Sequence, residues 1–280
     1  MKFPRGLVCL AALVAPLVFA ADVDRTGGPY VPTPQSVVNA MLEIAKVGPK
    51  DFVVDLGSGD GRIVLTAATQ YKASGMGVDI DPELVDLANA SARKLGVAER
   101  VHFIRQDVFA ADLSRTTVLT LYLLPGMMQS LRPKLLADLK PGTRIVSHDF
   151  TFHQWKPDRT VTVQTEEKYD LAGAWTSDIH LWIVPAAVQG SWRLSRAGET
   201  ADGRLDIRQG FQHFDGRFTR GERTVEVKDG RLDGARLTFS VPAGNGRREL
   251  FTGTVERDQI RGEVRDGEMV VARWSATRAP

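Results

Sequence analysis

The sequence predicts an α/β protein whose doubly wound sheet is followed by a small all-β domain. Up to about residue 187, short apolar runs alternate with segments of helical periodicity, which is the order of strands and crossover helices in such a sheet. Beyond that point, short alternating segments split by glycines replace the pattern, and no helix is expected there. The change of period marks the predicted domain boundary.

The first strand and its turn are the most informative stretch of the chain. An apolar strand at 53–56 runs into a turn, and helical sequence follows from Arg62 to Gln70. The turn consists of Gly57, Ser58, Gly59, Asp60 and Gly61. Strand, glycine-rich turn and helix form the nucleotide-binding unit of doubly wound sheets. Asp55 and Asp60 would repel a phosphate, so this turn favours a cationic ligand. S-adenosylmethionine (SAM) fits, because it carries an ammonium and a sulfonium group and no phosphate.

Two further strands are expected to end in acids at the same edge of the sheet. The strand at 75–80 ends at Asp79 and Ile80, where a carboxylate can accept hydrogen bonds from ribose hydroxyls. The strand at 101–108 brings Asp107 to the adenine amino group and the backbone N–H of Val108 to the ring. Asp81 is expected to cap a helix that runs from Pro82 to Leu95.

Together these residues resemble the class I SAM-dependent methyltransferases, whose Rossmann-like sheet has seven strands. The resemblance covers about Tyr30 to Pro185. A narrower resemblance, to small protein-lysine methyltransferases related to the enzyme that modifies the c-subunit of ATP synthase, comes from 29–34, the glycine turn, 123–125 and 147–150. It implies that Tyr30 and Thr33 lie near the methionine end of SAM, and it places Leu124 at the cofactor site. Thr33 as the N-cap of the helix at 37–45, with Pro34 at its first position, is an equally good interpretation.

His148 and Asp149 are the candidate catalytic residues. They end the strand at 144–150, on the rim where a methyl acceptor would enter. Methyl transfer requires alignment more than a base, but either side chain could accept a proton or orient an amine. For His148, a structural role at the strand end is the alternative. The strand at 117–124 ends in Leu-Leu-Pro and lacks the Asn-Pro-Pro-Tyr ending used for amide and adenine nitrogens, so we expect a different nitrogen nucleophile, such as a protein lysine.

Composition limits the partners. The chain has 280 residues, 43% of them hydrophobic, and a net charge of +2, with both signs interleaved. This pattern predicts no nucleic-acid footprint, and no metal-ligand spacing is present. The methyl acceptor, a protein or a small molecule, stays open. The alternative function is a non-catalytic envelope protein that binds a ligand or partner on the same fold.

Residues 1–20 have the pattern of a signal peptide. Lys2 and Arg5 precede the apolar run 6–19, and Val18-Phe19-Ala20 is an acceptable cleavage site. The pattern predicts a periplasmic or secreted protein with no membrane span in the mature chain. An uncleaved anchor in the inner membrane is the alternative. Export conflicts with the cofactor, because SAM is made in the cytoplasm.

The mature chain is predicted to hold a methyltransferase domain at 21–187 and an all-β barrel or sandwich at 188–280. Segments 161–169 and 180–184 are expected to form an antiparallel pair that completes the sheet, with His180 facing solvent. In the all-β domain, 228–230 and 265–267 have the composition of hairpin turns.

Overall fold

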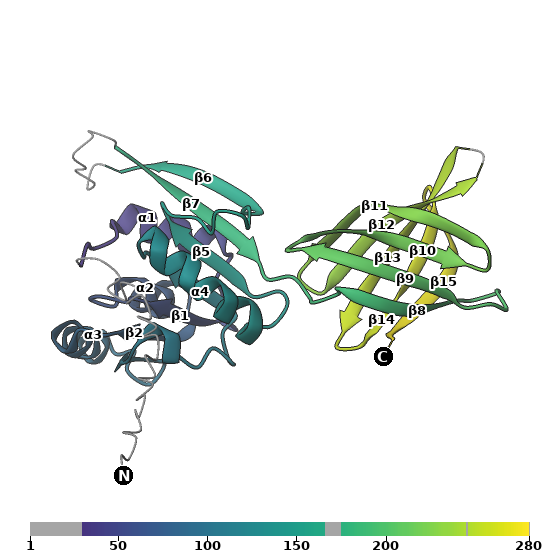
Figure 1. The fold of residues 1–280 in the computed structure, drawn as a ribbon. Coiled ribbons are helices and arrows are strands. Elements are labelled where there is room, and N and C mark those ends of the chain that lie inside the picture. The colour runs from purple at the N-terminus through teal and green to yellow at the C-terminus, as the bar shows by residue number, and fades with distance from the viewer. Residues whose placement is uncertain (1–29, 166–174, 245, 280) are drawn as a thin grey trace, which may run out of the picture.

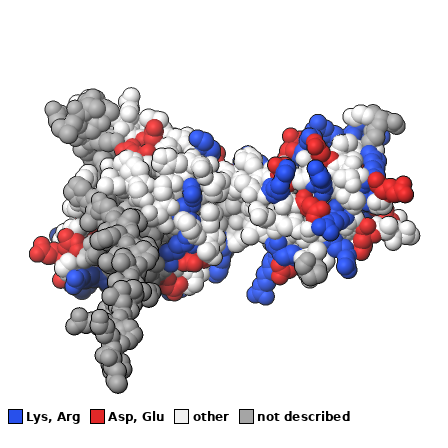
Figure 2. Space-filling view, in the orientation of Figure 1, with Lys and Arg blue, Asp and Glu red and all other residues white. Residues whose placement is uncertain are grey.

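The computed structural model describes residues 30–165, 175–244 and 246–279, which form two bodies side by side (Figure 1). The predicted signal peptide lies outside the described residues. Within the described part of the chain, no helix has the length and apolar character needed to cross a membrane. On the face of the barrel seen in Figure 2, Lys and Arg side chains alternate with Asp and Glu.

The first body is a seven-stranded sheet in the order β3-β2-β1-β4-β5-β7-β6, which confirms the predicted α/β fold. Strands β1 to β5 are parallel, and β7 is antiparallel to both of its neighbours. The strands are β1 (Phe52–Leu56), β2 (Ser74–Asp79), β3 (Val101–Arg105), β4 (Val118–Leu121), β5 (Arg144–His148), β6 (Arg159–Gln164) and β7 (Thr176–Ile183). The predicted segment 161–169 therefore contains only part of β6, and its last residues are not described.

Helices cover both faces of this sheet. They are α1 (Gln35–Ile44), α2 (Arg62–Gln70), α3 (Pro82–Lys94) and α4 (Pro125–Asp138), with a short 3-10 helix, η1 (Val108–Ala110). Neighbouring residues of β1 point to opposite cores. Val53 packs with α1 and α2, whereas Val54 packs with α4. This alternation explains why the central strands are apolar throughout.

Of the two predicted helix caps, one is present and one is not. Asp81 caps α3 as predicted, accepting hydrogen bonds from the backbone N–H groups of Glu83 (2.8 Å) and Leu84 (3.4 Å). Thr33 does not cap α1, because that helix begins at Gln35 after Pro34 and has no side-chain cap. The hydroxyl of Thr33 lies instead 3.4 Å from a buried histidine ring. The alternative interpretation of Thr33 as an N-cap is therefore wrong.

The second body is a closed barrel of eight antiparallel strands, in the order β10-β11-β12-β13-β14-β15-β8-β9. These are β8 (Gly190–Arg196), β9 (Gly203–Gly210), β10 (His213–Arg220), β11 (Arg223–Asp233), β12 (Arg236–Gly244), β13 (Arg247–Glu256), β14 (Gln259–Asp266) and β15 (Met269–Arg278). Aromatic side chains fill its interior. Phe239 and Phe251 stack at 4.8 Å, with Trp274 edge-on to both. Closure removes the exposed strand edges that a sandwich of this size would have.

One predicted hairpin turn is wrong and the other is confirmed. The turn near Gly267 joins β14 to β15, as expected. Residues 228–230, in contrast, lie inside β11, where the register with both neighbouring strands shifts. A side chain at Gly230 would collide with the carbonyl and ring of Phe214 on β10. The glycine is therefore needed for a β-bulge, and an Asp-Gly pair serves a bulge as well as a turn.

The two bodies share an interface. The linker at 185–189 is bonded to the barrel: Gln209 accepts from the N–H of Val188 (2.7 Å), and Arg278 donates to the carbonyls of Ala187 (2.8 Å) and Gln189 (2.7 Å). Across the interface, Gln212 donates to the carbonyl of Lys156 at 2.8 Å. The predicted division at 187/188 stays a prediction about independent folding, because these contacts join the two bodies.

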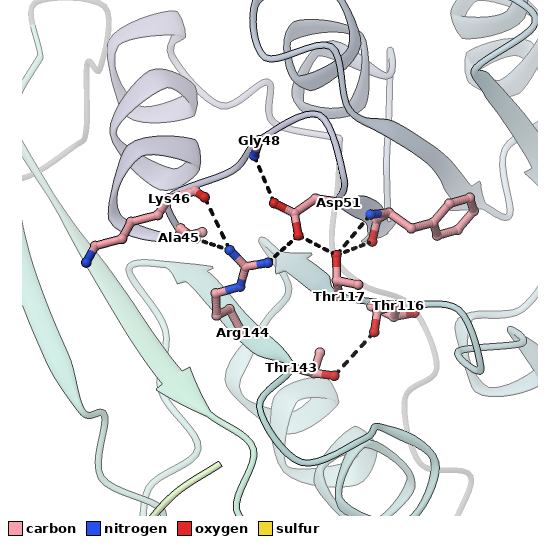
Figure 3. Close-up of polar contacts among 9 residues, drawn as sticks. Ala45, Lys46, Gly48, Asp51, Thr116, Thr117, Thr143 and Arg144 are labelled. Carbon is pink, nitrogen blue, oxygen red and sulfur yellow. Dashed lines mark hydrogen bonds and ion pairs between the residues drawn. The ribbon is translucent and has the colours of Figure 1, made fainter. Parts of the chain in front are cut away.

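One polar network closes the amino-terminal edge of the parallel sheet (Figure 3). The guanidinium of Arg144 on β5 donates to the carbonyl of Ala45 at 2.6 Å and pairs with the carboxylate of Asp51 before β1. Asp51 also accepts from the N–H of Gly48 (2.8 Å) and the hydroxyl of Thr117 (2.7 Å). A cation therefore satisfies the carbonyls of the two residues that follow α1, Ala45 and Lys46, while it neutralises a largely buried acid.

Candidate active site

A cleft of about 400 Å³ lies at the opposite, carboxyl-terminal edge of the sheet. The loops after β1, β2, β3 and β4 form its walls, and residues 30–33 form one side. This is the position where doubly wound sheets bind their ligands. Most of the predicted cofactor-binding residues line it: Tyr30, Thr33, Asp55, Gly57, Ser58, Gly59, Asp60, Asp79, Ile80, Asp107 and Val108. Gly61, Leu124, His148 and Asp149 are not among its lining residues.

The glycine turn has a backbone that only glycine adopts easily. Gly57, Gly59 and Gly61 all have positive φ, and Gly61 precedes the first residue of α2. A Cβ on Gly59 would lie 2.5 Å from the ring of Tyr30, so the missing side chain lets this aromatic ring cover the turn. The N–H of Gly59 donates to the Asp79 carboxylate at 2.7 Å, which joins the turn to the end of β2.

Asp55 is the buried acid of the cleft. Its side chain is 2% exposed and accepts a hydrogen bond from the hydroxyl of Thr120 at 2.7 Å. Burial raises the pKa of Asp55 to about 7, and the charges of Asp79 and Asp60 act in the same direction, although Thr120 opposes them. Burial therefore favours the neutral carboxyl, and a cation in the cleft would favour its ionised form.

Asp60 and Arg62 hold residues 30–34, the strap, against the glycine turn. Partial burial would raise the pKa of Asp60, but hydrogen bonds and charge from Arg62 outweigh it and lower that pKa. The guanidinium contacts both Asp60 oxygens, at 2.7 to 3.1 Å, and donates to the carbonyl of Thr33 at 2.8 Å. Burial and the Asp60 charge raise the pKa of Tyr30. Since Arg62 neutralises Asp60, the net negative character of the cleft comes mainly from its other acids.

Asp79 and Asp107 lie at the ends of neighbouring strands, as predicted. Asp79 accepts from the N–H of Asp81 at 3.0 Å in addition to that of Gly59. Asp107 accepts from the N–H of Phe109 at 2.9 Å and so caps η1. Each bond fixes a carboxylate orientation, and each carboxylate oxygen has a second lone pair. Ile80, between them in sequence, exposes 69% of its surface at the cleft mouth.

His148 lies behind the cleft wall. Its side chain is 1% exposed, its Nε2 is 2.9 Å from the Ser177 hydroxyl, and its ring stacks on Tyr122 at 3.9 Å. The Nδ1 atom faces the hydroxyl of Thr33 at 3.4 Å. In this arrangement the imidazole supports Tyr122 and the strap, and it has no exposed surface for an acceptor.

Asp149 is tied to β7. It has φ +62, an unfavourable value for a residue with a side chain, and its carboxylate accepts from the N–H of Asp178 at 3.0 Å. Its N–H donates to the carbonyl of Asp178 at 2.7 Å. His180 on β7 contacts the Asp149 carbonyl at 3.3 Å and the Thr160 hydroxyl at 2.9 Å, and it is buried. The expectation that His180 faces solvent is therefore wrong, because two polar partners compensate its burial.

Sequence reasoning missed part of the cleft wall. Arg62, Tyr122 and Met127 line it although we did not select them. Arg62 directly follows the glycine turn, and an arginine beside an acid there indicates an ion pair. Tyr122 directly precedes the Leu-Leu-Pro ending of the strand, so its position in the motif was the available signal. Nothing in the sequence pattern distinguishes Met127 from the other apolar residues of α4.

The cleft residues fit SAM. The acids suit its cationic end and its ribose hydroxyls, and the apolar Ile80 and Val108 suit an adenine ring. The buried hydroxyl of Ser58 has no hydrogen-bond partner among the described residues, so it can bond to a polar group of a ligand in the cleft. Among residues 30–165, 175–244 and 246–279, no group of three or more His, Cys, Asp or Glu side chains could hold a metal ion.

Known proteins agree with this assignment. A family model described as the ANTKMT methyltransferase domain matches residues 55–159. A protein-lysine N-methyltransferase from Saccharolobus islandicus is 46% identical over 137 residues, which are 49% of this chain and 85% of that protein. The lysine N-methyltransferase of the ATP synthase c-subunit from Xenopus laevis is 33% identical over 168 residues, 59% of this chain and 73% of that protein.

A solved structure supports the same family assignment. The crystal structure of an RNA methyltransferase from Salinibacter ruber, in complex with S-adenosyl-L-homocysteine (SAH), is 49% identical, covers 56% of this chain and 96% of that one, and has a TM-score of 0.51. The acidic cleft at the carboxyl edge of the sheet, the matched domain and these relatives lead to one conclusion: the chain belongs to the class I SAM-dependent methyltransferase family that includes the protein-lysine N-methyltransferases.

Proposed function

We propose that the protein transfers the methyl group of SAM to the side-chain nitrogen of a lysine in another protein. The observation that carries the proposal is the 46% identity to a protein-lysine N-methyltransferase over 85% of that enzyme's length. SAM supplies an electrophilic methyl group on a sulfonium. The residues of this chain then have to hold the acceptor in line and exclude water.

Tyr122 and Leu123 form the acceptor side in this proposal. They follow β4 at the centre of the sheet and line the cleft. A lysine amine has to lose its proton before it attacks. Both an apolar wall and a nearby sulfonium charge lower the pKa of an ammonium, so deprotonation does not require a dedicated base. This agrees with the burial of His148, whose ring packs behind Thr33 and Tyr122 and does not line the cleft.

A labelled-methyl assay tests the proposal. Purified protein is incubated with methyl-labelled SAM and, in separate reactions, with protein and RNA fractions from the source cells. We expect label in protein that is recovered as methyllysine after acid hydrolysis. Label in RNA would overturn the lysine assignment, and the similar Salinibacter structure, described as an RNA methyltransferase, is the reason to include that arm. An Asp79→Ala variant is the background control, because it retains the wall around Tyr122.

We also propose that the protein acts outside the cytoplasm. The support is the pattern of residues 1–20, where two basic residues precede an apolar run and a small-residue cleavage site. Cell fractionation and N-terminal sequencing test this. A mature chain that begins at Ala21 in the periplasm is the expected result. An intact terminus in the membrane fraction would favour the anchor, and an intact terminus in the cytoplasm would contradict export.

A further inference from the structure

The barrel presents one aromatic side chain to the methyltransferase body. Phe211, between β9 and β10, stacks its ring on Trp155 at 5.7 Å with the ring planes 8° apart. The guanidinium of Arg132 lies 5.7 Å from the centre of the same ring. Neighbouring bonds fix Phe211 at φ +58, because its carbonyl accepts from the Gln209 side chain at 2.8 Å and the next residue bonds to the other body.

Arg132 links the Phe211 ring to the loop at 150–155. From α4, its guanidinium donates to the carbonyl of Phe152 at 3.2 Å and to the side chain of Gln129 at 3.1 Å. Gln129 in turn donates to the carbonyl of Thr151 at 3.1 Å. Gln129 and Arg132 of α4 therefore hold two successive carbonyls of the loop. The guanidinium of Arg132 also lies over the Phe211 ring of the barrel.

The loop reaches the cleft through Phe150. Its ring stacks on Tyr122 with the centroids 6.1 Å apart and the planes at 17°. Tyr122 lines the cleft and also contacts the His148 ring. The same helix α4 contributes Met127 to the cleft wall, two residues before Gln129. The route from the barrel thus ends at Tyr122, directly after β4, whereas Asp55 lies on β1, Asp79 on β2 and Asp107 after β3. Of these three acids, Asp55 is bonded to β4 itself, through the hydroxyl of Thr120.

We propose that Phe211 of the barrel is a positioning residue for the acceptor side of the cleft, acting through Arg132 and the loop at 150–155 on Tyr122. The inference depends on the proposed function only in naming the Tyr122 wall as the acceptor side. The barrel then holds the wall that aligns the nucleophile, while the cofactor is held by the strap and by the residues at the ends of β1, β2 and β3. A packed, hydrogen-bonded route of this kind becomes a coupling only when a change at one end is measured at the other.

Hydrogen exchange followed by mass spectrometry tests the proposal on the full chain, with SAH bound at saturation. We expect Phe211→Ala to raise exchange at least about fivefold in 149–155 and in 122–129, because loss of the ring frees the loop and then the start of α4. The SAH dissociation constant, measured by calorimetry, should stay within about twofold of the original protein. Phe211→Tyr should restore the original exchange.

Two further variants keep the test decisive. Arg231→Ala removes the 3.3 Å ion pair with Asp158 at the same interface but not the Arg132 route, so exchange in 122–129 should not change. Arg132→Ala should reproduce the effect of Phe211→Ala from the other side, and the double variant should add nothing further. Faster exchange confined to 211–212 and 155–158, or spread evenly over the whole sheet, would overturn the proposal. Neither readout uses a methyl acceptor, so failure of the lysine assignment is a separate result.

Discussion

The two edges of the parallel sheet use similar polar residues for opposite purposes. At the amino-terminal edge, the Asp51 carboxylate meets a guanidinium, a hydroxyl and a backbone N–H. At the carboxyl-terminal edge, Asp55 is more deeply buried and has one neutral partner, Thr120, in the described structure, while other acids lie nearby. At the amino-terminal edge, groups of the protein itself neutralise the acid. At the carboxyl-terminal edge, Asp55 has no cationic partner of this kind among the described residues, and the acids there can interact with a bound ligand.

This difference suggests that the amino-terminal edge contributes mainly to folding stability and the carboxyl-terminal edge mainly to ligand affinity. A half-buried acid with a full set of partners stabilises the native state, and removing one partner leaves a charge uncompensated. A buried acid whose pKa is raised destabilises the ligand-free protein above that pKa, and a bound cation recovers the loss. Substitutions at the two edges should therefore separate stability from affinity.

The largest effect is expected at the amino-terminal edge. Arg144→Ala should lower the free energy of unfolding of the methyltransferase body by about 3 kcal/mol, because it leaves Asp51 and the carbonyls of Ala45 and Lys46 without their cation. Urea unfolding followed by the helical circular dichroism signal measures it. SAH affinity should change less than about twofold. Lys134→Ala is the control, since its pair with Asp138 is a surface i,i+4 pair and should matter by less than about 0.5 kcal/mol. A loss for Arg144→Ala no larger than that of the control would contradict the comparison.

Asp79→Ala should show the reverse pattern. It removes the acceptor expected for the ribose hydroxyls and the anchor of Gly59, so SAM and SAH should both bind more weakly by about 1–3 kcal/mol. Equal losses are expected, because the ribose is the same in both ligands. Calorimetry measures the two affinities, with the exposed Asp86→Ala on α3 as control. Unchanged binding would remove Asp79 from the cofactor site.

Asp55 predicts a dependence on pH. Its pKa is about 7 in the folded protein against 3.8 in the unfolded chain. Between these values the folded state binds the extra proton, so stability of the ligand-free protein falls as pH rises from about 4 to 7 and then levels off. A cationic ligand favours the ionised form. SAM binding should therefore release a proton below pH 7, and its affinity should rise by up to about tenfold per pH unit there.

Asp55→Asn should abolish this pH dependence. Calorimetry in buffers of different ionisation enthalpy counts the protons released. We expect the variant to weaken SAM more than SAH, since only SAM has the sulfonium charge. A variant with unchanged affinity for both ligands at pH 8 would show that the buried acid does not sense the cofactor.

Local rules were sufficient for the frame of the cleft. The order of strands, the acids at their ends and the Asp81 cap follow from periodicity, topology and capping, which act over a few residues. The same reasoning brought Asp55, Asp79 and Asp107 to one edge, because parallel strands end together. These features needed no knowledge of which side chains meet across the sheet.

Features set by tertiary packing could not be read in the same way. His148 ends its strand as expected, yet its burial depends on Tyr122 and on Ser177, which lies 29 residues further along the chain on the neighbouring strand β7. Residues 228–230 have a hairpin composition, and only the approach of Phe214 makes them a bulge. The contact of Phe211 with Trp155 joins two patterns that look independent in the sequence.

The smallest effect is expected for the hydroxyl of Tyr30 in the strap. Asp60 bonds to Arg62 through both of its oxygens and also accepts a hydrogen bond from the Tyr30 hydroxyl, which is therefore a further partner. In a phenylalanine variant the ring would still cover Gly59. Tyr30→Phe should weaken SAH binding by only about threefold. This is the effect expected from losing one hydrogen bond, to Asp60, whose place water can partly take. The measurement is calorimetry, with Tyr71→Phe at the far end of α2 as a matched control. A loss beyond about tenfold would mean that the hydroxyl itself contacts the cofactor. The strap would then contribute to ligand binding together with the carboxyl-terminal edge of the sheet. Its bonds to Asp60 and Arg62 would serve to orient that hydroxyl.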